Sequence, residues 1–338
     1  MTSSSTPGLG RKQGIFTISL DLEKLWGVHD SRPLDSYRGN LAGVDEVVDA
    51  LLERFSEKGI AATWATVGML MCENVEEARA LAPPHDARPI YKDPRLDPYR
   101  LLRDDALATS ERTLLFAPHL VKRIAATGGQ EVATHTFAHY LCLEDGASPA
   151  TFEADLEAAH RVADARGVEF HSIVFPRNQY AVEHLEVCRR QGLVAFRGNP
   201  DVDAHRPSSG VDQTPWMRAV RLLDAYLPIS KPTDFEVAVE GAVANVRASR
   251  FLRPSRREEG TLGVLRLRRV LAEMRRAAQR GRCYHLWWHP HNFGRDLEAN
   301  LLALDEILTH YAYLRERFDM RSATMRALGS EALSGEAA

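Results

Sequence analysis

Short apolar segments alternate with amphipathic helical patterns along most of this chain, and this alternation is what most restricts its fold. Residues 14–22 are β-branched and apolar, as a buried strand is, and the next helical stripe ends at Gly59, a residue typical just after a helix. Alternating strands and helices predict parallel βαβ units, arranged in an open sheet or a barrel. We expect strands at 14–22, 60–67, 131–135, 171–176 and 193–198, a last strand and loop at 283–293, and helices at 43–58, 114–127, 149–166, 181–191 and 260–279.

One α/β domain is expected, because no linker and no internal repeat interrupts the pattern. We place it at residues 14–328, after a polar, Gly/Ser-rich leader at 1–13 that we expect to be disordered, and before a flexible tail at 329–338. Residues 73–112 are rich in Pro, Asp and Arg and show weak periodicity. They are interpreted as an insertion that serves as a lid over one face.

The chain has no apolar run near the roughly 20 residues that span a bilayer, and its N-terminal segment lacks the apolar centre of a signal peptide. Its four cysteines are far apart and form no CxxC pair. These features favour a cytoplasmic protein with reduced thiols. The formal net charge of −3 gives no general reason to expect a nucleic-acid partner. No feature indicates the oligomeric state.

Polar side chains follow four of the expected strands at the point where each strand ends. In a parallel barrel these ends converge on one mouth, so the side chains are expected to lie close together. His135 and His139, four positions apart, can point both imidazoles to one side of a helical turn. The other clusters are Asp21 and Glu23, then Arg177, Asn178 and Gln179, and finally His289 and His291.

These residue types suit hydrolysis of an amide or ester with the help of a metal. Two imidazoles and one carboxylate form a ligand set that leaves coordination positions open for water and substrate. A bound cation lowers the pKa of water and polarises the carbonyl group. A second carboxylate can then serve as base, a histidine as acid, and an arginine can keep the base ionised.

The same motifs resemble those of the polysaccharide deacetylases of carbohydrate esterase family four, which share the NodB homology domain. Ser19 to Glu23 (SLDLE), Ala62 to Gly68 (ATWATVG), Gly129 to His139 (GQEVATHTFAH), FPRNQ and Leu286 to His291 (LWWHPH) are similar to that family's motifs, in family order. The resemblance implies a distorted (β/α) barrel of about seven strands, a divalent metal, with Zn²⁺ the expected ion, and removal of an acetyl group from an N-acetylated sugar. Related branches cleave formamides or the ring amides of small molecules.

By this resemblance Asp21 is the base, Arg177 orients it, and His289 is the acid, while Glu23, His135 and His139 hold the metal. The chain departs from the family at two places. Leu22 separates the two acidic residues, and Asn178 and Gln179 replace a proline and a tyrosine, which implies a different substrate floor. We expect substrate contacts from Asn178, Gln179, His291 and Trp288. Asp224 is the candidate partner of the acid histidine.

Simpler interpretations stand beside these. Trp287 and Trp288 can be strand packing rather than sugar platforms, His291 competes with His289 for the acid role, and Cys142 fits a buried structural thiol. The Arg-rich stretch 247–282 is interpreted as an amphipathic helix on the barrel, because apolar residues recur in it at helical spacing and aromatic residues for base stacking are nearly absent.

The sequence therefore predicts a cytoplasmic, divalent-metal-dependent deacetylase acting on an N-acetylated sugar, as a small molecule or an oligosaccharide. Two alternatives remain open at this level. One keeps the site and changes the substrate to a formamide, a cyclic amide or an O-acyl ester. The other is a carbohydrate-binding barrel without catalysis.

Overall fold

A computed structural model of the chain describes residues 12–103, 107–200, 233–255 and 260–336. The expected disordered leader, apart from its last residues, and Asp224 lie outside this part. The strands are β1 (Ile15–Leu22), β2 (Ala62–Thr66), β3 (Gln130–Thr134), β4 (Ser172–Ile173), β5 (Ala195–Phe196), β6 (Ala238–Glu240), β7 (Val243–Asn245), β8 (Arg250–Phe251), β9 (Cys283–Trp288) and β10 (Arg321–Ser322).

The strands form one sheet in the order β6-β7-β5-β4-β3-β2-β1-β9-β8, with β10 also paired to β1. Every pairing is parallel except that of β6 with β7. The order places β1 inside the sheet, between β2 and β9, where it is buried along nearly its whole length, as its continuous apolar sequence requires. The expected distorted barrel of parallel strands is thus confirmed, as an incomplete barrel with β6 and β8 at its ends.

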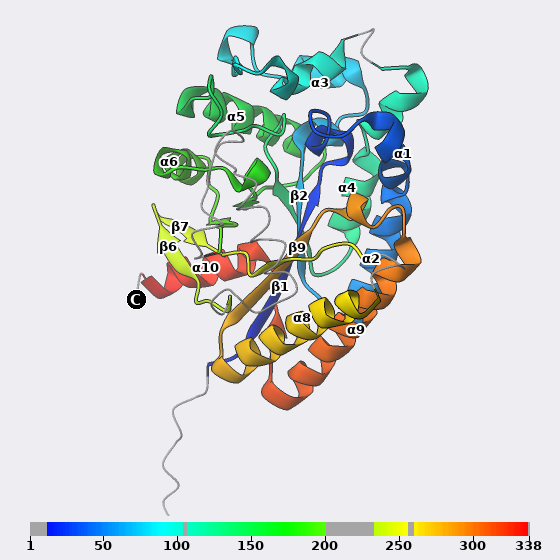
Figure 1. The fold of residues 1–338 in the computed structure, drawn as a ribbon. Coiled ribbons are helices and arrows are strands. Elements are labelled where there is room, and N and C mark those ends of the chain that lie inside the picture. The colour runs from blue at the N-terminus through cyan, green and yellow to red at the C-terminus, as the bar shows by residue number, and fades with distance from the viewer. Residues whose placement is uncertain (1–11, 104–106, 201–232, 256–259, 337–338) are drawn as a thin grey trace, which may run out of the picture.

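The helices cover the sheet on its outside (Figure 1). Helix α2 buries the six apolar residues of its predicted stripe and ends at Gly59, whose φ of 66° is the left-handed conformation expected there. The helices are α1 (Leu34–Ala42), α2 (Val44–Lys58), α3 (Val75–Leu81), α4 (Pro118–Ala126), α5 (Pro149–Ala165), α6 (Val182–Arg190), α8 (Gly260–Arg280), α9 (Leu297–Phe318) and α10 (Met325–Glu336).

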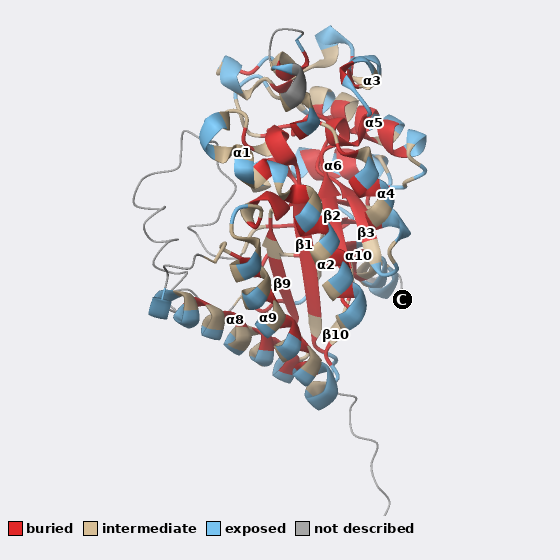
Figure 2. Ribbon diagram, turned by 90° about the vertical axis from the view of Figure 1, so that its right-hand side faces the viewer, coloured by how far each residue is buried: buried red, intermediate tan, exposed pale blue. Residues whose placement is uncertain are grey.

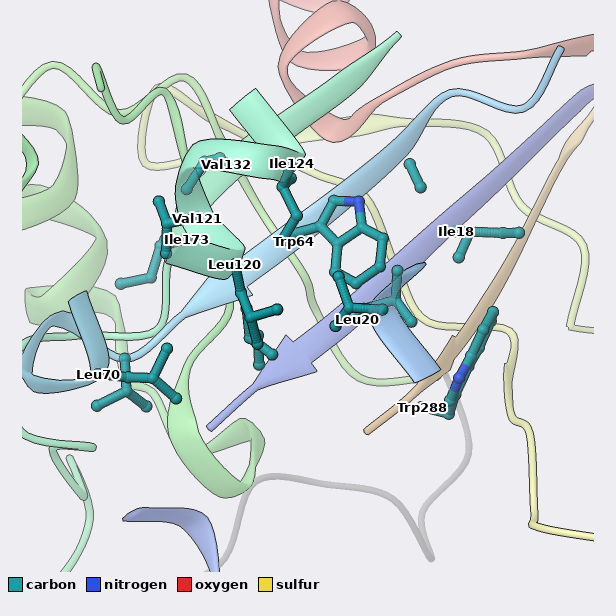
Figure 3. Close-up of a cluster of buried hydrophobic side chains, with 14 of the residues drawn as sticks. Ile18, Leu20, Trp64, Leu70, Leu120, Val121, Ile124, Val132, Ile173 and Trp288 are labelled. Carbon is teal, nitrogen blue, oxygen red and sulfur yellow. The ribbon is translucent and has the colours of Figure 1, made fainter. Parts of the chain in front are cut away.

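The buried residues concentrate in the sheet and on the inner faces of these helices (Figure 2). Trp288 lies in an apolar cluster with Leu20 and Trp64 (Figure 3), stacks on Phe293 and is fully buried. The expectation that Trp288 contacts substrate is therefore wrong, because its ring faces the core. All four cysteines, Cys142 included, are buried and free. No helix in the described ranges has the length and apolar character needed to cross a membrane.

The described residues of the segment, 73–103 and 107–112, are folded and lie above the carboxyl ends of the strands (Figure 1). Asn74 caps α3 by accepting a hydrogen bond from the Glu77 amide at 2.9 Å, and Asp93 and Asp97 begin short 3₁₀ turns in the same way. Arg100 donates to the backbone oxygen of His29 at 2.9 Å, which ties the insertion to the loop after β1. Its role as a lid stays a prediction.

Two elements differ from the expectations at the C-terminal end. Residues 297–318 form α9, for which no helix was predicted, and the expected flexible tail at 329–338 continues α10 as far as Glu336. The backbone amide of Met325 donates to Thr63 Oγ1 at 2.9 Å, and that of Arg326 donates to buried Glu131 at 3.0 Å. These bonds hold the start of α10 against β2 and β3, which explains why the segment is ordered.

Candidate metal centre

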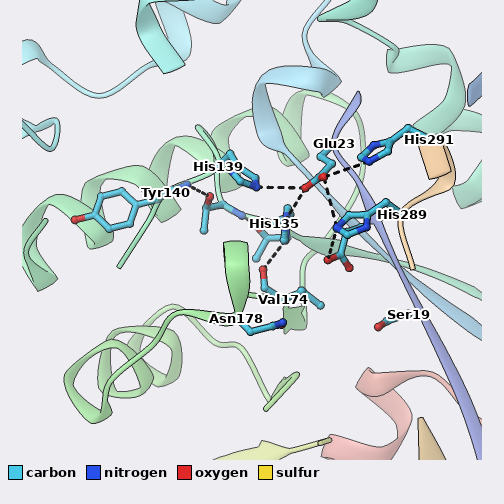
Figure 4. Close-up of polar contacts among 12 residues, drawn as sticks. Ser19, Glu23, His135, His139, Tyr140, Val174, Asn178, His289 and His291 are labelled. Atoms are coloured by element: carbon cyan, nitrogen blue, oxygen red, sulfur yellow. Dashed lines mark hydrogen bonds and ion pairs between the residues drawn. The ribbon is translucent and has the colours of Figure 1, made fainter. Parts of the chain in front are cut away.

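Three buried side chains converge at the carboxyl ends of β1 and β3 (Figure 4). The Oε2 atom of Glu23 lies 3.3 Å from His135 Nε2 and 3.2 Å from His139 Nε2. The ligand atoms of the three residues all lie within 4.8 Å of one another. The site thus brings together the three residues expected to hold a metal.

The two histidines come together through a tight loop, not through the helical turn that their spacing suggested. Thr136 and His139 have φ values of 64° and 52°, a conformation that non-glycine residues seldom adopt. Buried Asp155 of α5 holds the loop, because its carboxylate accepts hydrogen bonds from the amides of Phe137 at 2.6 Å and Ala138 at 3.2 Å. These two hydrogen bonds from the loop to Asp155 stabilise its strained backbone.

The orientation of His135 favours a cation. Its Nδ1 lies 2.7 Å from the carbonyl oxygen of Val174, so this nitrogen carries the proton and donates. The lone pair is then on Nε2, which faces Glu23, as in metal-binding histidines whose second nitrogen is fixed by a backbone carbonyl.

Gly27 makes room for the Glu23 carboxylate. A Cβ atom at this position would lie 1.9 Å from Glu23 Cδ and 2.0 Å from Oε1, so a larger residue would displace the carboxylate. Burial opposes ionisation of Glu23, but the nearby imidazoles of His289, His135 and His139 outweigh it and hold the pKa of Glu23 well below its usual value. A buried, ionised carboxylate with two imidazoles is the kind of ligand set that Zn²⁺ takes, so these residues fit a divalent cation.

The second acidic residue, Asp21, is held by an arginine that the sequence did not single out. Arg197 donates from Nη1 to Asp21 Oδ1 at 2.6 Å and from Nη2 to Oδ2 at 2.7 Å. Burial opposes ionisation of Asp21, but the Arg197 charge, with His135, outweighs it and lowers the pKa of the carboxyl group. Asp21 is therefore ionised, and its two hydrogen bonds from Arg197 fix the orientation of its carboxylate.

Arg177, which was expected to orient Asp21, lies elsewhere. It pairs with Asp30 on the rim of the site, where it is exposed. The reason is the backbone after β4, since Arg177 and Asn178 have φ values of 54° and 53° and the turn carries the side chain outward. The orienting role predicted for Arg177 is wrong in this structure, and Arg197 is in that position.

A buried network holds Arg197. Its Nη1 donates to Ser19 Oγ at 3.0 Å, and Ser19 donates to His285 Nε2 at 2.8 Å, while His285 Nδ1 lies 3.1 Å from the Val246 oxygen. The guanidinium also lies over the ring of Trp287, 4.0 Å from its centroid. Sequence reasoning missed Ser19, His285 and Arg197, although Arg197 directly follows β5 and thus had the strand-end position that marked the other candidates.

Asn178 and Gln179, which were expected to contact substrate, form hydrogen bonds with other residues of the protein. Asn178 Oδ1 accepts from Arg197 Nη2 at 3.0 Å, which places Asn178 beside the base. Gln179 is buried, donates to Glu144 at 2.7 Å and accepts from the Leu143 amide at 3.2 Å. Its amide is used to fix the loop at residues 143–144, so the expectation that Gln179 contacts substrate is wrong.

The two histidines after β9 face the same carboxylates. His289 Nε2 lies 3.7 Å from Asp21 Oδ2 and 3.6 Å from Glu23 Oε1, and His291 Nε2 lies 3.9 Å from the same Glu23 oxygen. His289 Nδ1 lies 3.1 Å from Asn292 Oδ1, so Asn292 is its partner among the described residues. Burial, with the nearby His289, lowers the pKa of His291 to about 3. His291 is therefore neutral at pH 7, whereas an acid must carry a proton to give.

Comparison with known proteins supports the fold described above, an incomplete barrel of mostly parallel strands. Residues 42–196, a little under half of the chain, match the family model described as polysaccharide deacetylase. This range contains His135, His139 and Arg177, and it ends one residue before Arg197. A search of curated proteins found no match.

Solved structures of similar fold extend over nearly the whole chain. One is a putative polysaccharide deacetylase from Mycobacterium smegmatis, with a TM-score of 0.59, 14% identity, and coverage of 99% of this chain and 96% of that one. PuuE allantoinase has a TM-score of 0.53 and 11% identity, covering 96% of this chain and 91% of that one. A GH57-type branching enzyme from Pyrococcus horikoshii has a TM-score of 0.50 and 13% identity, covering 94% and 70%. At these identities the likeness shows a shared fold, which hosts several chemistries. With this fold, and with a family model that matches part of it, the chain is similar to the polysaccharide deacetylases.

Proposed function

We propose that this protein is a divalent-metal-dependent hydrolase that removes the acetyl group from an N-acetylated sugar. The observation that carries the proposal is the convergence of Glu23, His135 and His139, with Asp21 and His289 beside them. Similarity to the polysaccharide deacetylase family model over residues 42–196 supports the reaction class. The assignment of Zn²⁺ and of each role belongs to the proposal.

Each side chain has a distinct task in the proposed reaction. Glu23, His135 and His139 would hold a divalent ion, which would supply Lewis-acid chemistry toward the acyl carbonyl and water. Asp21 accepts the proton of the attacking water, and Arg197 keeps Asp21 ionised and aimed. Asn178 steadies the same guanidinium.

His289 is the proposed proton donor to the leaving amine. Its Nε2 lies 3.7 Å from Asp21 and 3.6 Å from Glu23. The neighbouring His291 is a poor donor at neutral pH, because its pKa is lowered to about 3. The bond from His289 Nδ1 to Asn292 turns Nε2 toward the reacting groups. A histidine with Nε2 directed into the site can give its proton to the amine as the C–N bond breaks.

The test is an acetate-release screen with protein freed of metal by a chelator and then reloaded with Zn²⁺. Substrates should include free and nucleotide-linked N-acetylhexosamines, N-acetylated oligosaccharides, a formamide, a cyclic amide and an O-acetyl sugar. We expect acetate from an N-acetylated sugar only after reloading. Release of formate, ring opening or ester cleavage instead would move the proposal to one of the alternative substrates.

Asp21→Asn provides the matched variant, with expected loss of turnover by at least a thousandfold and retention of the metal. Asp234→Asn is the control, since Asp234 is also a buried, arginine-paired aspartate but lies away from the site. Full activity after chelation, or in Asp21→Asn, would contradict the mechanism. Sugar binding without turnover of any substrate would support a carbohydrate-binding barrel.

A further inference from the structure

We infer that the protein has a second divalent-cation site, formed by Glu23, His289 and His291, which shares the Glu23 carboxylate with the first site. The inference of the site rests on geometry alone. Its functional consequence, that excess zinc inhibits the enzyme, rests on the proposed function, because it depends on His289 being the proton donor.

The two oxygens of Glu23 face two different pairs of histidines (Figure 4). Oε2 lies 3.3 and 3.2 Å from the Nε2 atoms of His135 and His139, while Oε1 lies 3.6 and 3.9 Å from those of His289 and His291. In each group the three ligand atoms lie within 4.8 Å of one another. A carboxylate that presents one oxygen to each group can bridge two cations, as carboxylates do in two-metal sites.

The imidazole of His291 has no hydrogen-bond partner among the residues that the structure describes. The residue is only 3% exposed, and its Nδ1 has no partner among the described residues. Its Nε2 lies 3.9 Å from Glu23, beyond hydrogen-bond distance. The ring therefore makes no hydrogen bond with the described residues that would occupy Nε2, and this nitrogen, which faces Glu23, can bind a cation.

The neighbouring ring is held in a tautomer that can bind a cation. Asn292 donates from Nδ2 to Tyr37 Oη at 3.3 Å, which leaves its Oδ1 as the acceptor for His289 Nδ1. The lone pair of His289 is thus on Nε2, facing Glu23. The two imidazoles stack with centroids 5.0 Å apart and an angle of 14° between their planes, so they approach the same oxygen in parallel. Two imidazoles and a carboxylate suit Zn²⁺, Co²⁺ and similar ions.

The second site is the weaker of the two. Its histidines lie farther from Glu23 than those of the first site, and His289 is partly exposed, with 23% of its side chain accessible. A cation bound there occupies the lone pair that otherwise carries the proton of the acid. The enzyme with one cation is then the active form, and binding of the second cation stops proton donation to the leaving amine.

The experiment is a titration of metal-free protein with Zn²⁺, in which bound metal is measured by equilibrium dialysis and elemental analysis. We expect two ions per chain in wild type, the second with at least tenfold weaker affinity. His291→Asn should retain the first ion and weaken the second at least tenfold. His310→Asn, a histidine of α9 outside the site, should bind as wild type does. Titration of wild type with Co²⁺, followed by visible absorption, should show two steps and needs no variant.

A single ion per chain in wild type, at a hundredfold excess over the first dissociation constant, would overturn the inference. A second ion that persists in folded His291→Asn would also overturn it, because the ion would then lie elsewhere. If two ions bind as expected but no substrate releases acid, the proposed function fails and the site stands. If acetate release is unaffected by excess zinc and only one ion binds, the site fails and the proposed function stands. Inhibition of acetate release by at least tenfold, at the zinc concentrations where the second ion binds, supports both the second site and the proposed function.

Discussion

Arg197 and Asp21 form a buried ion pair with two contacts, although 176 positions separate them in the chain. Their side chains are 1% and 3% exposed, so solvent does not screen the charges. The pair joins the end of β1 to the end of β5, and it fixes both the charge and the direction of the proposed base. An isolated buried charge is costly, so each partner depends on the other.

Replacing Arg197 should expose this dependence. In Arg197→Gln the pKa of Asp21 should rise, because burial is then no longer outweighed by the guanidinium, and the acid limb of kcat/KM should move to higher pH. We expect the free energy of unfolding to fall by about 3–5 kcal/mol, as when one partner of a buried pair is removed. Both quantities can be measured, from pH–rate profiles and urea titrations.

Arg177→Gln is the matched control, since Arg177 pairs with Asp30 and not with Asp21, and 29% of its side chain is accessible, compared with 1% for Arg197. It should change the free energy of unfolding by less than about 1 kcal/mol, and the acid limb of kcat/KM should stay at the same pH. A larger kinetic shift in Arg177→Gln than in Arg197→Gln would restore Arg177 as the orienting arginine.

Gly27→Ala should weaken zinc binding without altering any ligand. Its methyl group would overlap the Glu23 carboxylate, so the carboxylate must move away from His135 and His139. We expect the dissociation constant of the first ion to rise at least tenfold, measured by competition with a chromophoric chelator. Gly39→Ala is the control, because no heavy atom lies within 4 Å of its added carbon. Unchanged affinity in Gly27→Ala would argue against Glu23 as a ligand.

His285 should make the protein sensitive to acid. Burial, with the charge of Arg197, lowers the pKa of His285 to about 3, compared with 6.5 in the unfolded chain. Below pH 6.5 the unfolded state therefore takes up a proton that the folded state does not, and stability falls as the pH falls. Between pH 6.5 and 5, metal-free wild type should lose about 2 kcal/mol more than His285→Gln in urea unfolding. The exposed His85→Gln should follow wild type, and parallel curves for all three proteins would contradict the assignment.

Asp155→Asn should loosen the loop that carries the two metal-binding histidines. The amide offers one acceptor where the carboxylate offers two, so one of the Phe137 and Ala138 amides loses its partner. We expect a loss of about 1–3 kcal/mol in stability and a fall of roughly 10–100-fold in zinc affinity. Asp164→Asn, on the exposed side of the same helix, should do neither. Stability that falls with no change in zinc affinity would show that the loop does not depend on Asp155.

Much of the fold could be predicted because the evidence for it is local. The stripe of α2 and its terminal Gly59 depend on helical spacing alone, and β1 depends on one continuous apolar run. Helix α9 carried a comparable signal, since Leu304, Ile307, Leu308, Tyr311 and Leu314 are buried at helical spacing, and it could have been predicted.

The arginine and tryptophan assignments failed for a different reason. Adjacent Trp287 and Trp288 point to opposite faces of β9, and only the pairing of that strand with β1, Leu20 opposite Trp288, determines which ring enters the core. Arg197 reaches Asp21 because β5 curls toward β1, and Arg177 turns away because of two left-handed residues. Such long-range geometry leaves no mark on short motifs.

The pairing of β1 also bears on how the protein is made. This strand lies between β2 and β9 and takes a further partner, β10, from residues 321 and 322. A ribosome therefore delivers an apolar strand, residues 15–22, hundreds of residues before its last neighbours emerge. Nascent chains should thus remain prone to aggregation until residues 321 and 322 have emerged, and the candidate metal centre should form late.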